Sequence, residues 1–191
     1  QDGRHLLRVR LALRPFHGYS ADAARDFREA LSLARRALDS DPEDPVGLRA
    51  AAVTVVLVER DYQAGWDLMD RSLAIDSNSA YSWALRGWIS IWAGEPEQAI
   101  PEFERAIRLS PYDQWISNYS LGMAFALNTS SRFEEGLRWA RRALQENPSW
   151  IACHRQLAGA LALVGRLEEA RDAARRHQSI DPNFTVRRWV E

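Results

Sequence analysis

The sequence has one cysteine, no lysine and no long hydrophobic run. Because a disulfide joins two cysteines, the single residue Cys153 excludes an intrachain disulfide and indicates a reducing compartment. We expect Cys153 to be a small buried helix residue rather than a reactive thiol. No apolar stretch reaches the ~18 residues that a membrane-spanning helix needs. These absences favour a cytoplasmic protein that makes no contact with a membrane.

Catalytic and metal-binding motifs are absent as well. None of the four histidines has a partner at helical metal-ligand spacing, and no HExxH or Cys–His cluster occurs. Glycine-rich nucleotide loops and the GxSxG nucleophile motif are also missing. The acidic pairs at 134–135 and 168–169 open predicted helices, where negative charge favours the helix dipole. The sequence therefore predicts a protein that is not an enzyme and that binds no cofactor and no metal.

The charge is balanced, with 25 arginines against 26 acidic residues and a net charge of −1. A near-zero net charge gives no global field that would attract nucleic acid. Adjacent arginine pairs recur near the ends of predicted helices, where cations complement the helix dipole. We therefore expect no direct binding to nucleic acid.

A proline-marked repeat runs through most of the chain. Its intervals are 35, 34, 37 and 34 residues, and a small residue stands five positions before four of its five members. A period of this length is typical of stacked helical hairpins, none of which can bury its apolar face alone. The marker positions are Pro42, Ser77, Pro111, Pro148 and Pro182, and the preceding residues are Ala37, Ser72, Ala106, Ala143 and, as the exception, His177.

The third repeat is the clearest, with predicted helices over 81–94 and 96–109. It resembles the tetratricopeptide repeat, whose pattern is W-x2-L-G-x2-Y, then A-x3-F, then P. Arg86 departs from the usual leucine, and Ser90 departs from the usual tyrosine. The resemblance implies an all-α, right-handed superhelical solenoid of about five antiparallel helix hairpins plus a short C-terminal capping helix. The matching residues are Trp83, Gly87, Ala99, Phe103, Ala106 and Pro111.

We predict a single repeat domain over residues 1–191. Its repeats are expected at about 4–42, 43–77, 78–111, 112–148 and 149–182, followed by a cap at 183–191. In the first repeat, a helix over 4–14 should precede a longer one over 21–40. The 37-residue length of the fourth repeat is expected to reflect extra residues around 128–131, a cluster of turn-forming side chains.

The resemblance also implies that the first helices of successive hairpins line a concave face that binds partners. Trp88 and Trp92 are four residues apart, so on a helix they share a face that differs from the packing stripe of Trp83 and Gly87. An exposed tryptophan pair would offer a large contact area to a partner, although both rings could instead pack on neighbouring helices. The candidate partner-binding residues are Tyr81, Trp88, Ile91, Trp92, Tyr119, Met123 and Arg155.

At finer grain, residues 84–113 and 141–171 resemble the C-terminal repeat regions of bacterial class III adenylate cyclase-like and winged-helix regulator proteins. This resemblance implies a protein- or peptide-binding scaffold that serves as the regulatory module of a larger bacterial signalling or transcription-regulating protein. Two alternatives remain open. The chain could be a self-association module that forms homo-oligomers, or the C-terminal part of a nucleotide cyclase whose catalytic domain lies elsewhere.

Overall fold

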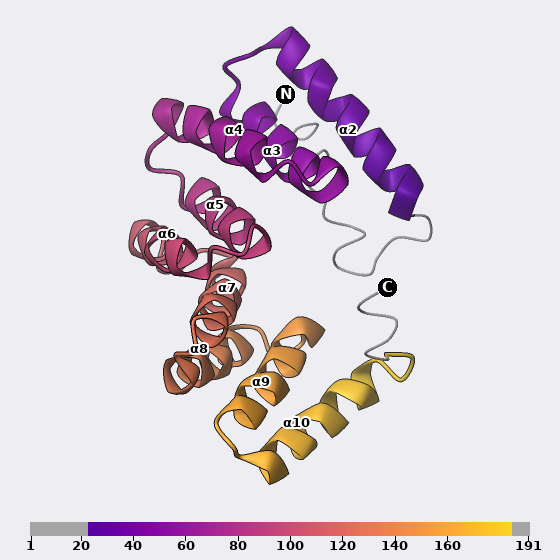
Figure 1. The fold of residues 1–191 in the computed structure, drawn as a ribbon, viewed down its shortest axis with the longest axis vertical. Helices are drawn as coiled ribbons and strands as arrows, with labels where there is room; N and C mark the ends of the chain where they lie inside the picture. The colour runs from indigo at the N-terminus through magenta and orange to yellow at the C-terminus, as the bar shows by residue number, and fades with distance from the viewer. Residues whose placement is uncertain (1–22, 185–191) are drawn as a thin grey trace. The chain divides into compact units, whose positions relative to one another are not determined.

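The computed structural model describes residues 23–184, and every regular element in this range is an α-helix (Figure 1). The chain divides into two compact units, Gln1–Gly94 and Glu95–Glu191. The all-α prediction is confirmed for the described residues. The predicted helix over 4–14 lies outside them, as does the predicted cap from residue 185 onward. The first unit holds α2 (Ala23–Ser40), α3 (Pro45–Glu59), α4 (Tyr62–Ile75) and α5 (Ala80–Trp92); the second holds α6 (Pro96–Leu109), α7 (Ile116–Thr129), α8 (Phe133–Glu146), α9 (Ile151–Leu163) and α10 (Leu167–Ile180).

Within each unit, helices pack against helices that are close to them in the sequence. In the first unit α3 contacts α2, α4 and α5, and in the second unit α7 contacts α6, α8 and α9. The two helices of each hairpin pack closely in α3–α4, α7–α8 and α9–α10. The turn that joins α9 to α10 lies at Gly165. This arrangement is the stacking of neighbouring hairpins that the repeat predicts.

The proline-marked positions form one recurring turn. In all five cases the residue before the marker accepts a backbone hydrogen bond from the residue three positions later, for example Ser79 N to Asp76 O at 3.4 Å. The accepting residue is always Asp, Asn or Ser, and the marker takes the next position, which is typical of a type I turn. Because this turn accepts most residues at its second position, Ser77 replaces proline without altering the turn.

Left-handed residues close a second series of turns, those between the first and second helix of a repeat. The φ angles are 57° at Arg60, 85° at Gly94, 60° at Ser131 and 78° at Gly165. Glycine adopts this conformation without steric cost, whereas a side chain on Arg60 or Ser131 makes it unfavourable. The left-handed turn therefore also forms at Arg60 and Ser131, where glycine is absent.

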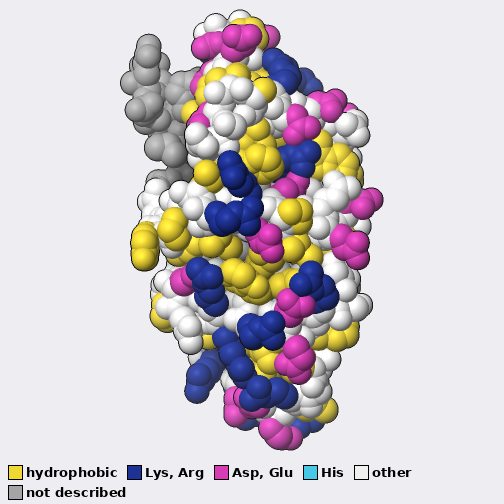
Figure 2. Space-filling model, turned by 90° about the vertical axis from the view of Figure 1, so that its left-hand side faces the viewer, with side chains coloured by type: hydrophobic (Ala, Val, Ile, Leu, Met, Phe, Trp, Pro, Cys, Tyr) yellow, Lys and Arg dark blue, Asp and Glu magenta, His cyan; other side chains and the backbone are white. Residues whose placement is uncertain are grey.

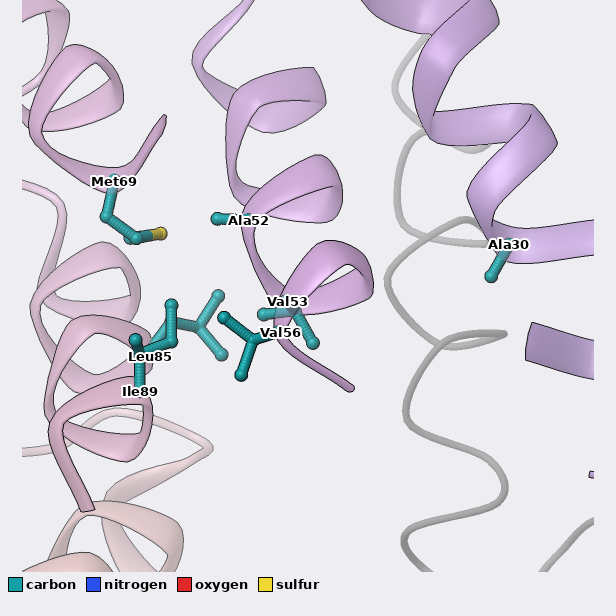
Figure 3. Close-up of a cluster of buried hydrophobic side chains, with 7 residues drawn as sticks. All are labelled: Ala30, Ala52, Val53, Val56, Met69, Leu85 and Ile89. Carbon is teal, nitrogen blue, oxygen red and sulfur yellow. The ribbon is translucent and has the colours of Figure 1, made fainter. Parts of the chain in front are cut away.

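The core of the first unit lies between α3, α4 and α5 (Figure 3). Val56 and Ile89 are fully buried there, and Gly65 on α4 faces both of them. A Cβ atom at Gly65 would lie 2.3 Å from Val56 Cγ2. Glycine stands here in place of the alanine of the repeat pattern, because the branched side chain of Val56 occupies the space that a Cβ atom would need.

A matching close approach occurs in the second unit, between α6 and α7. The ring of Phe103 is fully buried, and a Cβ atom at Gly122 would lie 2.2 Å from its Cζ. Gly122 therefore allows α7 to pack directly on an aromatic ring of α6. Ala99 and Ala106, on α6 as well, are also fully buried.

The two departures in the third repeat have structural explanations. Arg86 Nε donates a 2.7 Å hydrogen bond to Asp70 Oδ1, which links α5 to α4. Ser90 Oγ accepts a hydrogen bond from Trp66 Nε1 at 3.2 Å. Polar contacts between α4 and α5 thus replace the apolar packing that leucine and tyrosine usually provide at these positions.

The extra length of the fourth repeat lies mainly before α7, so our expectation for residues 128–131 was wrong. The connection between α6 and α7 runs over residues 110–115, whereas the one between α8 and α9 runs over 147–150. In addition, α7 has 14 residues and α5 has 13. The residues added before α7 are Gln114 and Trp115, which follow the recurring turn over 110–113.

Candidate functional site

The α5 surface, which we define as Tyr81, Ile91 and Trp92, is the most accessible group of candidate residues. All three side chains are partly exposed. Ser79 is the N-cap of α5, and its hydroxyl accepts a hydrogen bond from Ser82 N at 3.3 Å. Other sides of α5 pack against α3 and α4, so the helix holds these side chains on a rigid support.

Trp88 and Trp92 stack on each other, with ring centroids 6.1 Å apart and an interplanar angle of 28°. Trp88 is 6% exposed, whereas Trp92 is partly exposed and packs against the core of the first unit. The predicted shared face is therefore present, but its two members differ. Trp88 is the buried member that supports the ring of Trp92, and Trp92 is the partly exposed member.

Arg49 adds a charged group at the N-terminal end of the α5 surface. Its guanidinium carbon lies 5.9 Å from the centroid of the Tyr81 ring, a cation–π distance. Nη1 of the same side chain donates to Ser82 Oγ at 3.1 Å, so Arg49 of α3 is held against α5. Sequence reasoning missed Arg49, because nothing in the repeat pattern marks its position.

Three candidate residues lie in the second unit, and they occupy different environments. Tyr119 and Met123 on α7 are fully buried and contribute to packing. Arg155 on α9 is partly buried, with its guanidinium carbon 5.7 Å from the centroid of the Phe184 ring. Burial lowers the pKa of Arg155, and Asp181 partly opposes this shift. Of the three, Arg155 alone presents a charged group that a partner could contact.

Charged side chains of both signs lie among one another on the face shown in Figure 2. In the second unit, Arg132 pairs with Glu135 at 2.7 Å, and Glu169 pairs with both Arg166 and Arg141. Exposed pairs of this kind contribute little to stability, because water and salt screen them. These arginines are matched by nearby carboxylates and so do not form a basic strip.

Cys153 is fully buried on α9, with its sulfur 3.5 Å from Ser117 Oγ. Burial raises the pKa of this thiol to about 11, although the contact with Ser117 has a smaller lowering effect. Since the thiolate is the reactive form, Cys153 is a packing residue in this structure.

The thiol of Cys153 should therefore react slowly in the folded protein. We expect its reaction with Ellman's reagent at pH 8 to be at least about 100-fold slower in buffer than in guanidinium chloride, because the thiolate is scarce and shielded. No other thiol contributes to the signal. Equal rates in the two solvents would show that the side chain is accessible in the folded protein.

The described residues offer little for other chemistry. They include no group of three His, Cys, Asp or Glu side chains that could hold a metal ion. Among the helices of residues 23–184, none is both long and apolar enough to cross a lipid bilayer.

Comparison with known proteins supports the repeat assignment. Residues 93–149 match the tetratricopeptide repeat family, and no curated protein matches the sequence significantly. Among solved structures, the type IV pilus biogenesis factor PilW superposes with a TM-score of 0.78 and 19% identity, covering 95% of this chain and 80% of PilW. MamA from Desulfovibrio magneticus RS-1 gives a TM-score of 0.68 and 16% identity, covering 94% of this chain and 96% of MamA. YrrB, described as a TPR protein with an unusual peptide-binding site, gives a TM-score of 0.61 and 17% identity over 84% of this chain and 81% of its own. These similarities show that the fold is that of a tetratricopeptide repeat protein.

Proposed function

We propose that this chain is a non-catalytic scaffold that binds a protein or peptide partner on the α5 surface. The observation that carries the proposal is the stacked pair of Trp88 and Trp92, because Trp88 is buried and Trp92 is partly exposed. A rigid aromatic side chain offers a large contact area and loses little conformational entropy on binding. YrrB, which has the same fold and is described as having a peptide-binding site, supports the same function.

The chemistry of the α5 surface favours a partner with an apolar or aromatic anchor. Tyr81, Ile91 and Trp92 provide the apolar contacts, and Arg49 provides one cation beside Tyr81. The chain has no lysine, so a clamp of lysines for a terminal carboxylate does not fit. A segment that inserts an apolar side chain beside Trp92 matches this surface best.

In the second unit we propose Arg155 as a further partner contact. Tyr119 and Met123, which are fully buried, would support the packing of α7 rather than meet a partner directly. We also propose that the module serves a larger bacterial signalling or transcription-regulating protein in the cytoplasm. The resemblance of residues 84–113 and 141–171 to repeat regions of such proteins supports this assignment.

Peptides selected from a random library against the whole chain would test the proposed surface. We expect Trp92→Ala to weaken the best peptide about 30-fold, the effect of losing an aromatic anchor worth about 2 kcal/mol. Affinity would be measured by isothermal titration calorimetry, with circular dichroism to confirm that each variant is folded.

Trp139→Ala is the matched control, because Trp139 is also partly exposed but lies on α8 against Arg142. The affinity of the Trp139→Ala variant for the peptide should remain within about threefold of the affinity of the unmodified chain. Unchanged affinity in a folded Trp92→Ala variant would contradict the proposed surface. Light scattering over a concentration range would show whether the chain instead binds a second copy of itself.

A further inference from the structure

His177 is a buried titratable group near the end of the second unit. It lies on α10 at the position where three earlier repeats carry the fully buried residues Ser72, Ala106 and Ala143. The His177 side chain is 5% exposed, and its buried Nε2 has no hydrogen-bond partner. A protonated imidazole needs acceptors for both ring N–H groups, so this environment suits the neutral ring.

Phe184 covers His177. The two rings meet edge to face, with centroids 4.5 Å apart and an interplanar angle of 79°. The backbone N–H of Phe184 donates to Asp181 O at 3.2 Å in the last of the recurring turns. Arg155 of α9 also contacts the Phe184 ring. Phe184 thus joins the end of α10 to α9 through two contacts of its aromatic ring.

The charges around His177 mostly oppose its protonation. Burial lowers its pKa most, and Arg155 and His154 on α9 lower it further. Asp181, which follows α10, acts in the opposite direction but does not reverse the shift. Protonation would place a second cation close to Arg155 inside the same packed group.

We propose that His177, Phe184 and Arg155 form an acid-sensitive latch, which holds the C-terminal end of α10 closed at neutral pH and opens when His177 takes up a proton. The edge-to-face contact with Phe184 keeps the latch closed while the ring is neutral, and the buried Nε2 has no acceptor for the proton that an imidazolium would carry there. An imidazolium at this place would be desolvated and repelled by Arg155, and release of Phe184 returns it to water.

The direction of the pH dependence follows from the lowered pKa of His177. In the open form the imidazole has its ordinary value of about 6.5. Above that pH neither form takes up a proton, and the latch keeps its full stability. As the pH falls below about 6.5, the open form is protonated first, so the ratio of closed to open forms decreases by up to about tenfold per pH unit. The decrease ends at the pKa of the closed form.

Hydrogen exchange of the whole chain tests the latch, with protection factors of residues 176–184 compared at pH 7.5 and 5.5. In the unmodified chain we expect protection of this segment to fall at the lower pH, by up to about tenfold. His177→Gln keeps a polar side chain that cannot be protonated, and its protection should change less than twofold. His154→Gln is the matched control, and it should retain the fall because His154 is only partly buried and does not contact Phe184 in the latch.

An equal fall in His177→Gln and in the unmodified chain would overturn the proposal, as would constant protection in the unmodified chain. The ionisation of His177 in the unmodified chain gives a second measurement, by NMR, that does not depend on how the variants fold. A pKa of His177 below about 6.5 supports the latch, and a value at or above it overturns the proposal.

Discussion

Replacing Phe103 by alanine is expected to lower the free energy of unfolding of the second unit by about 3–5 kcal/mol. Its ring is fully buried between α6 and α7, and it fills the space directly above Gly122. Because Gly122 has no side chain, nothing on α7 can extend into the cavity that alanine would leave. Urea denaturation followed by circular dichroism would measure the loss.

Tyr112→Ala is the control for Phe103, since Tyr112 is an aromatic residue of the same unit that is 97% exposed. Its effect on the free energy of unfolding should stay within about 0.5 kcal/mol. A loss of less than 1 kcal/mol in Phe103→Ala would mean that α6 and α7 do not pack as the structure shows.

In the first unit, Ile89→Ala is expected to lower the free energy of unfolding by about 2–5 kcal/mol. Ile89 is fully buried where α5 meets Val56 of α3 and Gly65 of α4 (Figure 3). Thermal and urea denaturation would both report the change.

Ile91→Ala provides the matched control on the same helix, because Ile91 belongs to the partly exposed α5 surface. It should lose less than half as much stability as Ile89→Ala. Equal losses in the two variants would indicate that α5 is rotated about its axis from the orientation described above, and the α5 surface would then have to be redefined.

The sequence predicted the repeat well because its markers are tied to local geometry. Prolines preceded by Asp, Asn or Ser specify a turn by their own backbone preferences, and this turn occurs at all five marker positions. The helix over 96–109 was predicted at the residues where it occurs, since these turns fix where one helix ends and the next one starts. Local signals of this kind need no knowledge of tertiary packing.

The features that the sequence did not reveal depend on contacts between helices. Arg60 and Ser131 adopt left-handed turns that their residue types do not suggest. Arg86 and Ser90 became understandable when Asp70 and Trp66 were found opposite them. The partners of Arg86 and Ser90 lie on another helix. The conformations of Arg60 and Ser131 are imposed by the stacked repeats on either side of each turn.

The candidate site shows the same division. Trp88 and Trp92 were correctly placed on one face of a helix, because four residues correspond to about one turn. Their unequal burial depends on how α5 packs against its neighbours, and the complete burial of Tyr119 and Met123 depends on how α7 packs against its own. Helical spacing predicts which side chains share a face but not how deeply each one lies.

Crosslinking at Trp92 tests the central claim, that the α5 surface is where a partner binds. A photoreactive benzoylphenylalanine at position 92 should form a covalent adduct with a library-selected peptide, whereas the same residue at position 139 on α8 should form little or none. Mass spectrometry of the digested adduct would identify the attachment site. Efficient crosslinking at position 139 with none at position 92 would contradict the account.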